Sequence, residues 1–139
     1  FIDCYPHTIL TPHEGEFKKI FGNEIAEIDD RVLKTKEASI KSNTTVVLKG
    51  ANTIIASPSG DVVINKSSAT YLATAGSGDV LAGIITSLVG NNKMNAFDAA
   101  CAGVWLHSEI GTILGAGMIA EDIIDLIPVT VKKLLKMHQ

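Results

Sequence analysis

Residues 74–85 read TAGSGDVLAGII. Gly76 and Gly78 precede an apolar run with the pattern of a buried helix, so this stretch predicts a tight turn that enters a helix. The first N–H groups of a helix have no partner inside the helix, and the helix dipole adds partial positive charge there. The stretch therefore predicts an anion site at the helix start, formed by Gly76, Ser77 and Gly78.

The pattern matches neither of the common phosphate-binding motifs. No lysine follows Gly78, as a P-loop requires, and Leu81 stands where a dinucleotide-binding motif has its last glycine. From the glycines alone, a tight turn with close packing explains the stretch as well as a phosphate site does.

Asp79 has two explanations in this context. A carboxylate in the first turn of a helix stabilises that helix by about 0.3–1 kcal/mol. Alternatively, Asp79 accepts the proton of a hydroxyl group that attacks a bound phosphoryl group, and such a general base contributes about 10²–10⁴-fold to a rate. Both roles are compatible with each other.

Composition limits the class of protein. The chain has 139 residues, 46% of them apolar, and a net charge of −3, which fits one globular domain without a broad surface for nucleic acid. We see no signal peptide, and no segment that would span a membrane. Cys4 and Cys101 form no C-x-x-C motif, so we expect a reduced, cytoplasmic protein without a disulfide framework or a zinc site. We assign no residue as a metal ligand. The chain begins at Phe1 rather than Met, so we expect a fragment or a processed product.

The first part of the chain predicts a strand followed by helices. Ile9 and Leu10 end a strand, and Thr11 is placed to cap a helix with Glu14 completing a capping box. Gly22 predicts the end of this helix. A second helix begins after Asp29 or Asp30 and ends near Asn43.

The remainder predicts a small sheet and several helices. Residues 44–49 read as a strand, and residues 52–57 and 61–65 read as a hairpin. Helices are expected over 78–89, over 96–114 after the cap Asn95, over 119–127, and from Pro128 onward. Strands alternating with helices indicate an α/β domain with a largely parallel sheet, too small to give every helix a partner.

Four segments resemble one known family in the same order. They are TPHEGEF (11–17), VVLKGANT (46–53), LATAGSGDVLAGII (72–85) and GMIAEDIIDLIP (117–128). The third resembles the signature of ribokinase-like proteins, and the set resembles the ADP/ATP-dependent NAD(P)H-hydrate dehydratases. The resemblance implies a ribokinase-like three-layer sandwich with a mostly parallel central sheet. Because that domain is about twice as long, residues 1–139 would form the C-terminal half of a single nucleotide-binding domain.

The resemblance also implies roles for particular residues. Asp79 would be the catalytic base and would contact the substrate, and His13 would contact the hydrated nicotinamide nucleotide. The residues implied in nucleotide binding are Lys49, Gly50, Ala51, Asn52, Thr53, Gly76, Ser77 and Gly78. On the residues alone, His13 reads as a surface residue and Lys49 as a solvated strand end. Trp105 and His107 read as packing or surface residues without a role.

The implied reaction is dehydration of the S epimer of hydrated NADH or NADPH at the expense of ADP or ATP, with Mg²⁺. Two alternatives stay open: a ribokinase-like kinase of a small alcohol, and a nucleotide-binding half-domain without catalysis. The expected partners are the hydrated dinucleotide and the nucleotide, with no nucleic acid and no membrane. We also expect a homo-oligomer, and a requirement for the missing N-terminal half.

Overall fold

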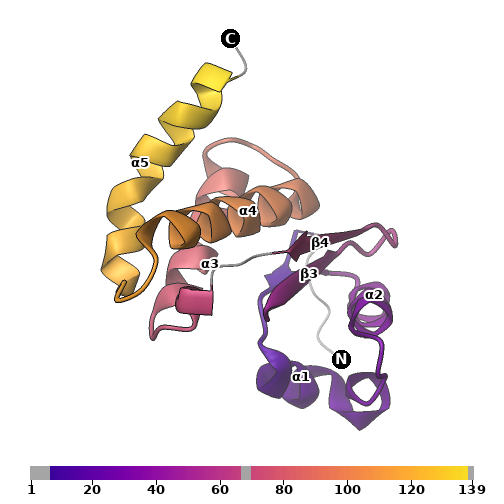
Figure 1. Cartoon of the computed structure of the whole chain (residues 1–139). Coiled ribbons are helices and arrows are strands. Elements are labelled where there is room, and N and C mark those ends of the chain that lie inside the picture. Colours follow the sequence, from indigo (N-terminus) through magenta and orange to yellow (C-terminus); the bar gives the residue numbers. More distant parts are fainter. Residues whose placement is uncertain (1–6, 67–69, 138–139) are drawn as a thin grey trace.

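The computed structural model describes residues 7–66 and 70–137, and it has an α/β architecture (Figure 1). The strands are β1 (Ile9–Leu10), β2 (Thr45–Leu48), β3 (Asn52–Ala56) and β4 (Val62–Lys66). The helices are α1 (Glu14–Ala26), α2 (Arg31–Ser42), α3 (Ser77–Gly90), α4 (Ala96–Leu114) and α5 (Ala120–Met137), with a 3₁₀ turn η1 at Thr70–Leu72.

The described strands form one mixed sheet in the order β1-β2-β3-β4. β1 pairs with β2 in parallel, whereas β2 with β3 and β3 with β4 pair antiparallel. The expected hairpin is confirmed, but in the described residues parallel pairing is confined to β1 and β2. Short connections cause this, because only a long crossover can bring the next strand back in parallel.

Helices cover both faces of the sheet, which confirms the three-layer arrangement (Figure 1). On one face, Val46 and Leu48 pack with Phe17, Phe21 and other residues of α1 and α2. On the other face, Val47 and Ile55 pack with apolar residues of α3 and α4. Successive side chains of β2 point to opposite faces, and both faces are buried, so this strand is apolar without alternation.

The start of α1 differs from the expectation. His13, not Thr11, is the N-cap: its Nδ1 accepts from the N–H groups of Gly15 and Glu16, and the Glu16 carboxylate accepts from the His13 N–H. The chain stays extended through Pro12, because the Pro12 carbonyl oxygen accepts the Lys49 N–H at 2.9 Å beside the sheet. The helix therefore starts two residues later than the proline suggested.

The other helix limits are mostly as expected. Asp30 caps α2, Asn43 ends it with φ of 52°, and Asn95 caps α4. Gly22 breaks the helical geometry of α1 with φ of 74°, but one further turn follows it as far as Ala26.

Pro128 does not begin a new helix. It lies inside α5, which runs continuously from Ala120 to Met137. Ile123 before the proline and Val131 after it pack into the same apolar cluster with α3 and α4. This shared packing keeps both halves in one helix despite the missing N–H of proline.

The structure bears only in part on two expectations from composition, because some residues lie outside its described ranges. Cys101 is a free thiol, whereas Cys4 lies outside the described residues. Among the helices described, none combines the length and the apolar character that a membrane span requires.

Candidate functional site

A cavity of about 540 Å³ lies where the β2–β3 loop, the start of α3 and the middle of α4 meet. Its wall is formed by His13, Lys49, Gly50, Ala51, Thr53, Asn65, Thr70, Leu72, Ala73, Thr74, Ser77, Gly78, Leu81, Val104, His107 and Ser108. The TPHEGEF, LKGANT and glycine-turn segments therefore contribute to one cavity. Seven of the expected site residues lie on its wall.

The first turn of α3 is open to a ligand. Its N-cap is Gly76, with φ of 83°, and no side chain caps the helix. A side chain on Gly76 would be strained at this φ, and its Cβ would lie 3.1 Å from the Cβ of Ala120 at the start of α5. Gly76 thus permits both the turn and the close packing of α5 behind it.

Lys49 brings a positive charge to this helix start. Its Nζ lies 3.1 Å from the position that a Cβ on Gly78 would occupy, and its side chain is 28% exposed. The carboxylate of Glu16 lies 3.9 Å from this ammonium group. A lysine amine beside an uncapped helix N-terminus is suited to bind phosphate.

Some N–H groups expected to face a phosphate are already engaged. The Asp79 N–H donates to the Gly76 carbonyl oxygen at 3.0 Å, and the Ser77 N–H donates to the Thr74 carbonyl oxygen at 3.3 Å. In addition to the backbone N–H groups, the Lys49 ammonium group lies close enough to this helix start to bind an anion there.

His107 lies directly behind the glycine turn. Its Nε2 is 3.0 Å from both the hydroxyl and the carbonyl oxygen of Ser77, so the carbonyl contact places the proton on Nε2. Burial lowers the pKa of His107, the hydrogen bond to Ser77 acts in the opposite direction, and the charge of Lys49 lowers it further. The imidazole is therefore a neutral hydrogen-bonding support for Ser77, whose own side chain is buried.

Arg31 holds the loop between β2 and β3. Its Nη1 donates to the Asn52 carbonyl oxygen at 2.7 Å, and its Nη2 donates to the Lys49 carbonyl oxygen at 3.3 Å. Within the loop, the Thr53 hydroxyl donates to the Gly50 carbonyl oxygen at 3.3 Å. The backbone of this loop is thus held by Arg31 of α2 and by a hydrogen bond within the loop itself.

His13 lines the cavity while it caps α1. Its Nε2 lies 3.4 Å from Glu16, and its side chain is largely exposed. The pKa of Glu16 is lowered, chiefly by the hydrogen bond from the His13 backbone N–H, which outweighs partial burial, and further by the charge of Lys49. The capping interaction fixes the orientation of the imidazole at the mouth of the cavity.

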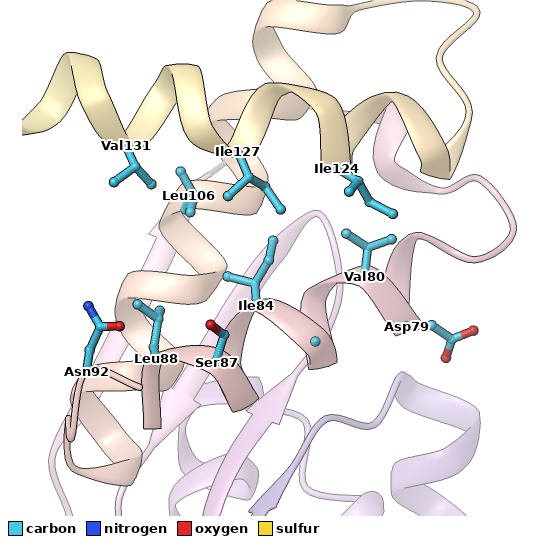
Figure 2. A pocket seen from close by; sticks show the side chains of 11 residues that line it. Asp79, Val80, Ile84, Ser87, Leu88, Asn92, Leu106, Ile124, Ile127 and Val131 are labelled. Atoms are coloured by element: carbon cyan, nitrogen blue, oxygen red, sulfur yellow. The ribbon is translucent and has the colours of Figure 1, made fainter. Parts of the chain in front are cut away.

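Asp79 lies outside the wall of this cavity, at the edge of a second one. The second cavity, of about 600 Å³, is called here the α3–α5 groove. Its wall is formed by Asp79, Val80, Gly83, Ile84, Ser87, Leu88, Asn92, Leu106, Ile124, Ile127 and Val131. Figure 2 shows the apolar side chains of α3 and α5 facing each other, with the Asp79 carboxylate at one end and directed away from them.

Two further expected residues, Asn52 and Gly76, also lie off the first cavity wall. Asn52 contributes its carbonyl oxygen to Arg31, and Gly76 provides the turn.

Sequence reasoning missed Arg31 and His107. For His107 a signal existed, because it lies four residues from Gly103 and Gly111 on the buried face of α4, where a polar ring needs a partner. For Arg31 the signal was a cation in the first turn of a helix, where the helix dipole disfavours it.

Among residues 7–66 and 70–137, no group of three or more histidine, cysteine, aspartate or glutamate side chains could hold a metal ion. Asp79 is a single carboxylate beside the glycine turn. This fits Mg²⁺, which commonly takes one or two carboxylates together with substrate phosphates and water.

Comparison with known proteins identifies relatives of this chain. Residues 3–128 match the family model described as NAD(P)H-hydrate dehydratase. The ADP-dependent (S)-NAD(P)H-hydrate dehydratase of Neisseria meningitidis is 41% identical over 122 residues, which cover 83% of this chain and 41% of that protein. The bifunctional NAD(P)H-hydrate repair enzyme of Gloeobacter violaceus is 44% identical over 109 residues, covering 78% of this chain and 21% of that protein.

Solved structures show the same fold. The ADP/ATP-dependent NAD(P)H-hydrate dehydratase of Bacillus subtilis, co-crystallised with ATP and Mg²⁺, matches with a TM-score of 0.77 and 32% identity over 90% of this chain and 47% of that chain. A ribokinase-like superfamily protein of Enterococcus faecalis matches with a TM-score of 0.75 and 27% identity, over 90% of this chain and 44% of that chain. The chain spans less than half the length of each of these proteins. The matching family model, the shared ribokinase-like fold and the order of the motifs together show that this chain belongs to the NAD(P)H-hydrate dehydratase family.

Proposed function

We propose that this chain is the C-terminal half of a nucleotide-binding domain that dehydrates the S epimer of hydrated NADH or NADPH with ADP or ATP. One observation carries the proposal: the Lys49 ammonium group lies close to Gly78 in the first turn of α3. This helix start has no side-chain cap, and Gly78 directly precedes Asp79. The ADP-dependent (S)-NAD(P)H-hydrate dehydratase of N. meningitidis and the ADP/ATP-dependent NAD(P)H-hydrate dehydratase of B. subtilis support the same reaction.

The residues divide into three roles in this proposal. Lys49 and the turn Gly76–Gly78 bind the phosphates of the nucleotide, and residues 49–53 bind its AMP moiety. His13, oriented by its cap on α1, contacts the hydrated nicotinamide nucleotide. Asp79 accepts the proton of the ring hydroxyl group as that hydroxyl attacks the terminal phosphoryl group.

The proposed reaction balances as follows. The bond from the terminal phosphorus to the bridging oxygen breaks, a bond to the ring hydroxyl oxygen forms, and Asp79 takes the hydroxyl proton. Phosphate then leaves the ring carbon, a proton leaves its neighbour, and the ring double bond returns. The products are NAD(P)H, phosphate, and AMP from ADP or ADP from ATP. Bound Mg²⁺ supplies neutralisation of the phosphate charges.

We also propose that the rest of the domain covers the α3–α5 groove and completes the substrate site beside Asp79. The relatives are more than twice as long as the segments they share with this chain, which supports this arrangement. A homo-oligomeric assembly and a cytoplasmic location are further predictions, the latter from the cysteine pattern.

Asp79→Asn in the full-length protein tests the catalytic role. The protein is mixed with hydrated NADH, Mg²⁺ and either ADP or ATP, and the return of the near-UV absorbance of NADH is followed. We expect Asp79→Asn to lower turnover by about 10²–10⁴-fold while nucleotide affinity changes little, because the lost group moves a proton and does not hold phosphate.

Asp125→Asn provides the control, since Asp125 is an exposed aspartate on α5 outside both cavities. A stable phosphoester of a small alcohol as the product would favour the kinase. Nucleotide binding without turnover, unchanged by Asp79→Asn, would favour a binding module.

A further inference from the structure

The side chain of Arg31 makes contacts beyond those of an ordinary surface arginine. Nη1 and Nη2 donate to the carbonyl oxygens of Asn52 and Lys49, at 2.7 and 3.3 Å. Its Nε donates to the Glu14 carboxylate at 2.7 Å. One planar guanidinium group thus joins the start of α1, the start of α2 and both ends of the β2–β3 loop.

Glu14 is itself held on two sides. Its Oε1 accepts from Arg31, and its Oε2 accepts from the Lys34 Nζ at 2.8 Å. Lys34 is buried, and its ammonium group lies 5.7 Å from the centre of the Phe17 ring. Partial burial of Glu14 would raise its pKa, but the hydrogen bonds and charges of Lys34 and Arg31 hold it below its ordinary value. The carboxylate is therefore a fixed, charged anchor for Arg31.

The absence of a side chain at Gly50 allows the guanidinium group to pack closely against the loop backbone. A Cβ on Gly50 would lie 2.6 Å from Nη2 and 3.2 Å from Cζ of Arg31. An arginine terminus can usually move aside, but this one would have to give up hydrogen bonds to two carbonyl oxygens and a carboxylate. The observed position of Arg31 therefore requires a residue without a Cβ at position 50.

The location of Arg31 argues against a role in helix stability alone. It is the first residue of α2, where the helix dipole is unfavourable for a cation. The loop that it holds carries Lys49, whose ammonium group reaches the start of α3. A shift of the loop would move that charge away from the phosphate position.

We propose that Arg31, anchored by Glu14, is a positioning residue that sets the β2–β3 loop and thereby the affinity for the adenine nucleotide. This inference rests on the proposed function, because it takes residues 49–53 to bind the nucleotide.

The test uses the full-length protein with Arg31→Lys, Arg31→Ala, Gly50→Ala and the double variant Arg31→Ala/Gly50→Ala. Calorimetry measures the Kd for ADP, and hydrogen exchange measures protection of the amides of residues 50–53. Lysine keeps the charge but lacks the planar group whose three nitrogens reach two carbonyl oxygens and a carboxylate at once, so we expect about a ten-fold or larger rise in Kd and faster exchange in the loop. For the Arg31 single variants at saturating nucleotide, kcat should change less than about three-fold, because the reacting groups are untouched.

The double variant separates two causes. If Gly50→Ala acts by displacing Arg31, it should raise Kd by about ten-fold in the parent and by less than about two-fold in Arg31→Ala. If the added methyl group blocks the nucleotide directly, the two effects on Kd will be equal. Lys41→Ala is the matched control, because Lys41 is also a cation on α2 that pairs with a glutamate of α1, at 3.5 Å from Glu24, but it has no contact with the loop in the described residues.

The outcomes distinguish the two proposals. Arg31 variants that bind ADP like the parent, with unchanged loop exchange, overturn the positioning role even if dehydration proceeds. A parent that binds ADP but does not dehydrate hydrated NADH overturns the function, while the affinity changes still decide the role of Arg31. A parent that binds no adenine nucleotide overturns both. If Arg31→Ala does not fold, Arg31→Lys and Glu14→Gln, each with the same expected rise in Kd, decide the question.

Discussion

At the scale of single residues, His107 shows how a buried polar side chain supports the glycine turn at the start of α3. The ring bonds to Ser77, thirty positions away in sequence, and it lies within the electrostatic influence of Lys49. The neutral imidazole donates a hydrogen bond through Nε2 without adding a second positive charge near Lys49. Protonation of His107 would place two cations close to the glycine turn.

The pH dependence of stability should report on His107. Its folded pKa lies below the ordinary value of 6.5, so the unfolded chain takes up a proton first as the pH falls below about 6.5. Stability should therefore decrease from that pH down to the folded pKa, and His107→Gln should remove this part of the decrease. Melting temperatures of the full-length protein from pH 8 to pH 5 measure it. His7→Gln, at an exposed position, is the control, and parallel curves for parent and His107→Gln would contradict the assignment.

At the scale of elements, α5 is a helix that persists through a proline. Pro128 is exposed, and its flanking residues Ile123 and Val131 pack on α3 and α4. Tertiary packing thus outweighs the effect of a proline inside a helix, which would destabilise an isolated helix by about 3 kcal/mol.

Pro128→Ala should stabilise the full-length protein. Alanine restores a backbone N–H that can bond to the preceding turn, and little packing is lost because Pro128 is exposed. We expect a gain of roughly 1 kcal/mol or more, or a few degrees in Tm, measured by thermal unfolding. The exposed neighbour Val129→Ala should stay within about 0.5 kcal/mol of the parent. A lower Tm for Pro128→Ala would mean that the proline fixes a bend that the packing of α5 needs.

At the scale of the whole molecule, the two sides of α3 differ in how they are covered. One side is buried against the sheet and α4, whereas the other opens onto the α3–α5 groove (Figure 2). The chain spans less than half the length of its relatives, and we propose that the remainder of the domain covers this apolar groove.

Ile124→Lys should have opposite effects in two contexts. In the 139-residue chain expressed alone, which we expect to be inactive and prone to associate, lysine at this 53% exposed position should reduce association and dye binding to apolar surface. In the full-length protein the same lysine would be buried without a partner and should destabilise by about 2 kcal/mol or more. Light scattering and thermal unfolding measure the two effects.

Ile113→Lys is the matched control, since Ile113 is also 53% exposed and lies outside the groove. A monodisperse, cooperatively melting 139-residue chain would contradict the expectation that this piece needs the rest of the domain. So would a full-length protein that tolerates Ile124→Lys as well as Ile113→Lys.

The sequence by itself determined the local structure wherever a single residue has one dominant local preference. Asp30 and Asn95 cap helices because their side chains accept N–H groups of the first turn, and Asn43 ends α2 because asparagine tolerates positive φ. The β2 strand and the β3–β4 hairpin follow from β-branched runs and a turn of Pro, Ser and Gly. The glycine turn and the family motifs likewise follow from sequence alone.

Only the tertiary structure decided the contacts between those segments. That Lys49 reaches Gly78, that Arg31 spans the β2–β3 loop and that His107 supports Ser77 depends on how helices pack on both faces of the sheet. Local preferences act over a few residues, as at Thr11 and Pro128, where packing and backbone pairing overrode the expected helix starts. Contacts across 18 to 30 positions are set by the burial of apolar surface, which depends on the whole fold and cannot be read from a short pattern.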